Sequence, residues 1–200
     1  MQTAWVAART CYSPDSPIEL INGEEPEDKE MLKLLNHIIT HKHHSVLEHC
    51  HMTFAVKDVS RTLLAQYSRH RIGVSLSVQS QRYVSEKHLE STFDYIIPQS
   101  VLRDEVSKLE FKKTMNDIQE AYNKLKEIGI PSEDARFVLP GAASTNMVTS
   151  LNLRSIFDLY EKRVVAKGAQ WEIKEFVKEL IREMLKYEPW LEKYFSEVIN

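Results

Sequence analysis

The chain has 200 residues, of which 42% are hydrophobic and 28% charged, and its formal net charge is −3. This composition is typical of a globular protein and excludes an intrinsically disordered chain. The small negative charge argues against a general nucleic-acid binder, whose nonspecific affinity depends on excess lysine and arginine. Because 200 residues suit a single domain, we expect residues 1–200 to form one.

The two cysteines, Cys11 and Cys50, indicate the compartment. Two isolated thiols cannot build a disulfide framework and suit a reducing environment. Arg9 interrupts the N-terminal apolar residues, so no signal peptide is expected, and no apolar run reaches the length of a membrane span. These features predict a cytoplasmic protein that binds no membrane.

Apolar residues at helical spacing predict most of the regular structure. The helices are expected at residues 3–12, 28–41, 61–71 and 99–128, briefly from 132 to before Pro140, from 153 onward, and from about 170 until Pro189. Residues 21–28 are expected to form a polar loop. Ser60 and Asn152 suit N-caps, whereas Gly73 and Gly129 suit the residues that end a helix.

Alternating apolar and polar residues predict a few strands. Residues 51–57 put Met52, Phe54 and Val56 on one face, and residues 74–78 and 147–152 also look extended. These strands do not alternate regularly with helices, so we predict the α+β class. We expect a helix-rich single domain with a small, mostly antiparallel twisted sheet flanked by long helices.

The segment QYSRHRIGVSLSVQSQRY, residues 66–83, gathers three arginines, a histidine and three glutamines. The five glycines form neither G-x-G-x-x-G nor a P-loop, and no serine lies in G-x-S-x-G. A guanidinium can instead fork onto a phosphate or an imide edge. Basic residues at a helix end also complement the helix dipole. Composition alone therefore leaves open a nucleotide or phosphate site and a solvated helix end.

A histidine-rich segment, HIITHKHHSVLEHCH at residues 37–51, leaves another alternative open. His37 and His41 are spaced i, i+4 on an expected helix, and such clusters can ligate zinc or iron. Helix-end histidines also complement the dipole and hydrogen-bond locally. Without H-E-x-x-H or paired C-x-x-C motifs, we assign no metal ligand.

Six blocks of the chain resemble the flavin-dependent thymidylate synthases. SRTLLAQYSRHRIGVSLSVQSQRYV is similar to the family signature, in which R-H-R is followed at a set distance by Ser-x-Arg. AARTCYSP, HHSVLEHCHMTFAVK, IPSEDARFVLP, NLRSIFDLYEKR and AQWEI resemble further blocks in the family's order. The likeness covers nearly the whole chain.

Two features depart from the family pattern. Eight residues separate Arg71 from Ser80, whereas the commonest motif has seven. This puts Val78 where members often carry Glu or Gln. Members also usually begin with a strand, whereas this chain starts almost at its first helix.

The resemblance implies the reductive methylation of dUMP to dTMP. It implies methylenetetrahydrofolate as carbon donor, NADPH as reductant and FAD as hydride carrier. It also implies a homotetramer whose active sites are shared between subunits, with no nucleic-acid partner. The cysteines agree with a route that needs no cysteine nucleophile, because neither Cys11 nor Cys50 follows a proline.

The resemblance also assigns site residues. The implied FAD contacts are His43, Ser45, Arg69, His70, Arg71, Val78, Asn152, Leu153, Arg154 and Asp158. The implied dUMP contacts are Gln66, Tyr67, Ser68, Arg69, Val78, Gln79, Ser80, Gln81, Arg82, Arg136 and Arg163. Of these, Arg163 and Ser80 are the implied catalytic residues.

Arg163 matches the arginine thought to favour ionisation of the uracil N3, because a fixed guanidinium lowers the pKa of an adjacent imide. Ser80 offers a hydroxyl to the substrate. Two functions of other classes remain as alternatives. One is a nucleotide- or RNA-binding module that uses the same Arg and Gln cluster without catalysis, and the other is a metal-dependent phosphohydrolase built on the histidines.

Overall fold

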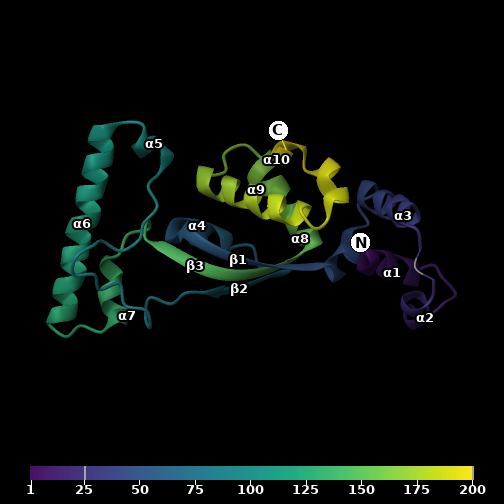
Figure 1. The fold of residues 1–200 in the computed structure, drawn as a ribbon, viewed down its shortest axis with the longest axis horizontal. Coiled ribbons are helices and arrows are strands. Elements are labelled where there is room, and N and C mark those ends of the chain that lie inside the picture. Colours follow the sequence, from purple (N-terminus) through teal and green to yellow (C-terminus); the bar gives the residue numbers. More distant parts are fainter. Residues whose placement is uncertain (25, 200) are drawn as a thin grey trace. The chain divides into compact units, whose positions relative to one another are not determined.

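The computed structural model describes residues 1–24 and 26–199 (Figure 1). It combines many helices with a small three-stranded antiparallel sheet, so the predicted α+β class is confirmed. Contacts group the chain into two compact units that interleave along the sequence. Unit 1 comprises Met1–Phe54, His70–Ser75 and Ser150–Asn200, and unit 2 comprises Ala55–Arg69 and Leu76–Thr149. The single domain expected for residues 1–200 stays a prediction.

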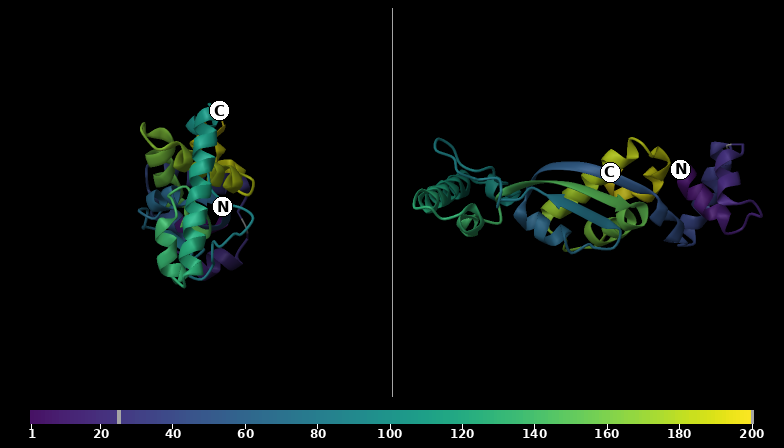
Figure 2. Two further views of the ribbon diagram at one scale, coloured as in Figure 1. Left: turned by 90° about the vertical axis from the view of Figure 1, so that its left-hand side faces the viewer. Right: turned by 90° about the horizontal axis from the view of Figure 1, so that it is seen from below.

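The sheet has the strand order β1-β3-β2, so the last strand in sequence pairs with both others (Figure 2). The strands are β1 (His51–Ser60), β2 (Val74–Val78) and β3 (Ser144–Asn152). Up to Lys57, β1 alternates exposed and partly buried residues in the predicted register, as does all of β2. In β3, Thr145, Met147, Thr149 and Leu151 are buried, which is expected of a central strand with one covered face.

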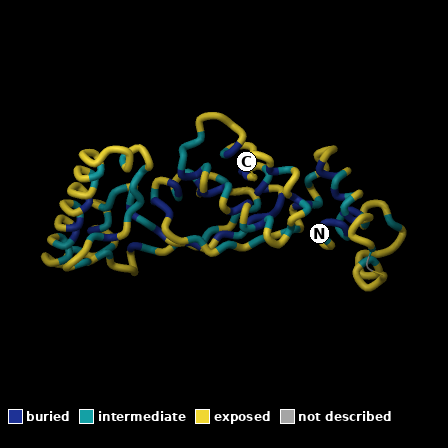
Figure 3. Tube along the Cα trace, turned by 45° about the horizontal axis from the view of Figure 1, so that its top comes forward, coloured by how far each residue is buried: buried dark blue, intermediate teal, exposed yellow. Residues whose placement is uncertain are grey.

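Unit 1 contains most of the helices. They are α1 (Gln2–Thr10), α2 (Pro17–Asn22), α3 (Asp28–Thr40), η1 (His44–His49), α8 (Leu153–Tyr160), the π-helix η3 (Glu161–Val165), α9 (Trp171–Leu185), η4 (Pro189–Tyr194) and α10 (Ser196–Ile199). Its core includes Leu47, Ile173 and Phe195, which are fully buried, and Figure 3 shows buried positions recurring along most of these helices. The Phe195 ring lies 5.0 Å from that of Tyr160, edge to face.

Unit 2 contains α4 (Arg61–Tyr67), α5 (Gln99–Leu102), α6 (Glu105–Glu127), α7 (Ser132–Ala135) and η2 (Arg136–Val138). Phe93, Met115 and Ala143 form a buried cluster against which Tyr95 and Phe111 pack. This cluster attaches the long α6 helix to the segment that precedes β3.

Three local predictions are wrong, the first two because of a polar contact. Part of α2 lies in the expected 21–28 loop, and its start is fixed by a capping box between Ser16 and Glu19. The expected 99–128 helix is two helices, because Asp104 accepts hydrogen bonds from the backbone and begins α6 anew. The 61–71 helix ends at Tyr67, so Gly73 does not terminate it.

Gly73 instead occupies a crowded turn in unit 1. Its φ is +64°, in the region that favours glycine, and its carbonyl accepts a hydrogen bond of 3.0 Å from the backbone N–H of Asn152. A Cβ placed there would lie 2.3 Å from Nδ2 of Asn152 and 2.4 Å from Oγ of Ser155. The glycine therefore allows the turn to approach the start of α8.

We expect Gly73→Ala to lower the free energy of unfolding by about 3 kcal/mol, from the positive φ together with the steric overlap. Gly168→Ala is the matched control, since Gly168 has a φ of +94° and open space around its missing side chain. It should cost only about 1 kcal/mol. Urea denaturation followed by circular dichroism measures both, and equal losses would contradict the close packing.

Candidate functional site

The predicted catalytic residue Arg163 is hydrogen-bonded to the histidine of the R-H-R motif. Its Nε donates to Nε2 of His70 at 3.0 Å, and both residues belong to unit 1. Arg163 lies in the π-helix η3, a rare geometry that recurs at functional sites. Because a guanidinium only donates, Nε2 of His70 accepts, so the imidazole is neutral and carries its proton on Nδ1.

The start of α8 is tied to the segment that follows R-H-R. Oδ1 of Asn152 accepts a hydrogen bond of 2.9 Å from the backbone N–H of Ser155, so Asn152 caps the helix as predicted. Oγ of Ser155 donates to the carbonyl of Ile72 at 2.7 Å. Leu153 is buried, and its N–H donates to the carbonyl of Cys50. Asn152 and Leu153, both predicted FAD contacts, thus also hold the local fold.

Arg154 and Asp158, on the next turns of α8, are exposed and ion-paired. Arg154 pairs with Glu48 on η1, and Asp158 pairs with Lys162 at 2.7 Å. Exposed pairs of this kind contribute about 0–1 kcal/mol, so exchanging the partner for a ligand costs little.

His43 and Ser45 line a cavity of about 390 Å³ in unit 1, together with Arg9 of α1 and His37 of α3. Nε of Arg9 is buried and has no hydrogen-bond partner. The rings of His37 and His41 lie 4.1 Å apart, centroid to centroid. The cavity therefore combines a guanidinium with imidazoles and a hydroxyl, a chemistry that suits a polar or anionic ligand.

The predicted substrate residues that follow β2 are held in place within unit 2. The N–H of Gln79 donates to the carbonyl of Asn146 at 2.9 Å, which continues the pairing of β2 with β3 beyond Val78. Ser80 accepts on its Oγ from the N–H of Arg82 at 3.3 Å, which forms a turn. Gln81 is only 9% exposed, and its Nε2 has no partner. A buried donor of this kind is destabilising unless an acceptor reaches it.

Glu133 of α7 contacts both arginines that are predicted to bind phosphate. Its carboxylate lies 2.8 Å from Nη2 of Arg82, and its backbone carbonyl accepts from Nε of Arg136 at 3.0 Å. The two guanidinium groups thus share one anchor, although they are 54 positions apart in sequence. This arrangement provides two cations for a phosphate group.

The end of α4 supplies the remaining predicted residues of unit 2. Gln66 is partly buried, whereas Ser68 and Arg69 are exposed. Tyr67 is fully buried and hydrogen-bonds Oγ1 of Thr149 at 2.8 Å. Burial raises the pKa of Tyr67 to about 12, although the hydrogen bond opposes this. Tyr67 therefore belongs to the core that supports this segment.

The predicted set divides between the two units. The His43, Ser45, His70, Arg71, Asn152–Asp158 and Arg163 positions lie in unit 1, and Arg71 is exposed there. The Gln66–Arg69, Val78–Arg82 and Arg136 positions lie in unit 2. Most implied FAD contacts thus belong to one unit and most implied dUMP contacts to the other.

Sequence reasoning missed Arg9 and Glu133. Each lies inside a quoted family block, AARTCYSP or IPSEDARFVLP. Their importance depends on hydrogen bonds to distant residues or on a missing partner, neither of which a linear pattern displays.

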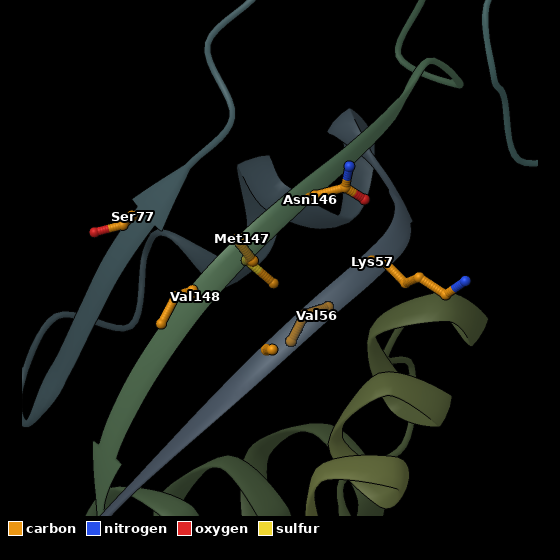
Figure 4. Close-up of a pocket in the computed structure, with 7 residues that line it drawn as sticks. Val56, Lys57, Ser77, Asn146, Met147 and Val148 are labelled. Atoms are coloured by element: carbon orange, nitrogen blue, oxygen red, sulfur yellow. The ribbon is translucent and has the colours of Figure 1, made fainter.

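A second hollow, of about 570 Å³, lies along the unit 2 part of the sheet (Figure 4). Its described lining is mostly apolar, with Lys57, Ser77 and Asn146 as the polar residues, and it includes no arginine. It therefore lacks the guanidinium groups that the predicted ligands need.

No three or more His, Cys, Asp or Glu side chains come together to hold a metal ion in residues 1–24 and 26–199. Within the same residues, no helix has the length and apolar character to cross a bilayer. The histidine-rich segment thus contributes imidazoles to the 390 Å³ cavity rather than a ligand set.

Known proteins match this chain over most of its length. A family model described as thymidylate synthase complementing protein matches residues 1–190. The flavin-dependent thymidylate synthase of Clostridium tetani is 35% identical, over 94% of this chain and 79% of its own length. That of Geobacter sulfurreducens is 37% identical, over 88% and 74%. That of Haloarcula marismortui is 34% identical, over 96% and 88%.

We expect His70 to be the neutral Nδ1–H tautomer, because its Nε2 accepts from Arg163. Nitrogen-15 NMR of histidine-labelled protein distinguishes the two ring nitrogens. Arg163→Met should let His70 sample the other tautomer, whereas Arg182→Met, which removes an exposed arginine of α9, should leave the signal unchanged. A proton on Nε2 in the wild type would contradict the hydrogen bond.

The buried Tyr67 makes stability depend on alkaline pH. Its folded pKa of about 12 exceeds the usual 10.0, so its contribution is complete below pH 10 and is lost as the pH rises through about 12. The free energy of unfolding of the wild type minus that of Tyr67→Phe should therefore fall by about 2 kcal/mol as the pH rises from 10 to about 12. Urea midpoints across the pH range measure it. Tyr187→Phe, at an exposed position, is the control, and a constant difference between wild type and Tyr67→Phe would refute the assignment.

Proposed function

Because the chain belongs to the family of thymidylate synthase complementing proteins, we propose that it converts dUMP to dTMP as a flavin-dependent thymidylate synthase. Methylenetetrahydrofolate would donate the carbon and NADPH the electrons. The similar proteins of Clostridium tetani and Geobacter sulfurreducens carry that enzyme name. The structural observation that carries the proposal is the contact between R-H-R and Arg163, which joins two separate parts of the family pattern.

The cavity lined by His43 and Ser45 supports FAD as the cofactor. The Arg9 guanidinium in its lining fits a polar or anionic group, and Arg71 of R-H-R adds a cation from the same unit. When bound, FAD supplies the hydride chemistry, and the protein binds and orients it. Asn152 and Arg154, at the start of α8, add a helix N-terminus, which favours negative charge.

Recognition of dUMP is assigned to the residues of unit 2. Arg82 and Arg136 are the candidates for the phosphate, since paired guanidinium groups match its geometry. The buried Nε2 of Gln81 is a donor without a partner, and a uracil carbonyl has the acceptor that it needs. The hydroxyl of Ser80 is assigned a hydrogen bond to the substrate, because its Oγ accepts from the Arg82 N–H and no described contact joins it to a base.

Arg163 is assigned to the uracil imide. The hydrogen bond to His70 uses Nε, so the two Nη groups are the donors that would face the ring. A neutral partner fixes the guanidinium without cancelling its charge, which favours the N3 anion and the charge that develops during methylation.

The state of the thiols supports a route without a cysteine nucleophile. Burial raises the pKa of Cys50, and the Glu188 carboxylate adds to this, although the N-terminal amino group opposes it. A raised pKa keeps the thiol protonated and therefore a poor nucleophile. Cys11 is exposed at the end of α1.

We further propose a cytoplasmic homotetramer whose subunits share active sites. Large apolar side chains stay exposed on the described single chain, including Val106, Leu109 and Phe137. Val106 and Leu109 are three positions apart on α6 and so share one face of that helix, and an exposed apolar face favours burial against another subunit.

The proposed function is tested with purified protein. The wild type should be yellow with bound flavin and should convert dUMP to dTMP when methylenetetrahydrofolate and NADPH are supplied. Arg163→Ala should reduce turnover by at least about 100-fold, because a charge-stabilising donor is lost. It should retain flavin, and Arg182→Ala should behave as the wild type. A colourless protein that takes up no FAD, or one that holds a stoichiometric metal instead, would overturn the proposal.

A further inference from the structure

Arg61, the first residue of α4, has no role in the proposed site so far, yet its guanidinium contacts a predicted substrate residue. Its Nη2 donates to the backbone carbonyl of Gln79 at 3.0 Å, and both residues belong to unit 2. Gln79 directly precedes Ser80, so this bond lies at the start of the predicted dUMP-binding turn.

Arg61 completes a clamp around Gln79. Asn146 on β3 accepts from the Gln79 N–H at 2.9 Å and donates from its Nδ2 to Oε1 of Gln79 at 2.8 Å. Asn146 also accepts on Oδ1 from the N–H of Asp58 in β1. Without Arg61, the N–H and the side chain of Gln79 would still be held by Asn146. Its carbonyl would have no partner, so the peptide group between Gln79 and Ser80 would be free to rotate.

The backbone at Arg61 is itself fixed by hydrogen bonds. Its N–H donates to the carbonyl of Ala143 at 3.0 Å, and Thr62 donates to the carbonyl of Gly141 through both N–H and Oγ1. Gly141 packs so closely that a Cβ would lie 2.6 Å from Oγ1 of Thr62. These contacts connect Arg61 to the loop that follows Arg136, so the guanidinium projects from a rigid base.

The surroundings of Arg61 are electrostatically unusual. Its Nε is buried without a partner. Burial lowers the pKa of Arg61, the Glu86 carboxylate opposes this, and the charge of Arg136 adds to it. The guanidinium remains charged at neutral pH. Its bond to the Gln79 carbonyl is therefore a charge-assisted hydrogen bond, which is stronger than a bond between neutral groups.

We propose that Arg61 is a positioning residue for dUMP, which holds the Gln79 carbonyl so that Ser80 and Gln81 present their side chains to the substrate. This inference rests on the proposed function. It assigns Arg61 an effect on substrate affinity through Gln79, without direct contact with the substrate and without an effect on the flavin.

The test compares four variants by dUMP titration and steady-state kinetics. Arg61→Met should raise the dissociation constant and the KM for dUMP about tenfold, the loss of one charge-assisted hydrogen bond. The kcat at saturating dUMP and the FAD affinity should stay within about twofold. Arg61→Lys keeps a charged donor and should restore dUMP affinity to within about threefold of the wild type.

Two further variants complete the design. Arg61→Gln ends two bonds short of the Gln79 carbonyl but keeps a polar group in the half-buried setting, so it replaces Arg61→Met if that variant does not fold. It should show the same tenfold loss. Arg103→Met removes the charge of an exposed arginine in unit 2 and should leave dUMP binding unchanged.

The outcomes separate this inference from the proposed function. If the wild type takes up FAD but binds no dUMP, the proposed function fails. If the wild type binds dUMP and both Arg61→Met and Arg61→Gln bind it equally well, only the role of Arg61 is refuted. A tenfold loss in Arg61→Lys with FAD affinity intact would mean that the guanidinium itself touches the substrate, which also overturns a positioning role.

Discussion

The structure depends on arginines that are held by neutral acceptors. Arg163 donates to an imidazole, Arg61 to the carbonyl of Gln79 and Arg136 to the carbonyl of Glu133. A neutral acceptor fixes the direction of a guanidinium without compensating its charge, whereas a carboxylate does both. The positive field is therefore preserved for phosphates and for developing negative charge. Arg82 and Arg154, which pair with carboxylates, must exchange or share their partners when an anion binds.

The same constraint explains why few glycines are needed. A glycine-rich cradle binds phosphate through backbone N–H groups, and the chain must then approach the ligand closely. Guanidinium groups reach several ångströms from the backbone, so the chain can stay in strands and helices. Gly73 is needed for a different reason, because its missing side chain lets the turn pack against the start of α8.

Much of the fold could be predicted from the sequence where one local signal decides. The alternation in β1 and the caps at Ser60 and Asn152 are confirmed, because period and capping are properties of neighbouring residues. The prediction was wrong where a competing polar contact interrupts an apolar pattern, as at Asp104, or where a short helix rests on a cap rather than on periodicity, as after Ser16. Family membership was also readable from the blocks, and the comparisons confirm it. The contacts within the candidate site were not readable, since His70 and Arg163 are 93 positions apart.

In the π-helix from Glu161 to Val165, the number of residues in the turn, and not only their identity, determines where the Arg163 side chain points. A π-helix closes its turns with i→i+5 rather than i→i+4 hydrogen bonds, so the residues of this last turn, Arg163 among them, project in directions that a continued α-helix would not give them. A homologue shorter by a single position in this turn would direct its arginine elsewhere, even if every aligned letter agreed. Gaps near Arg163 are therefore as informative as substitutions when the activity of a distant relative is judged.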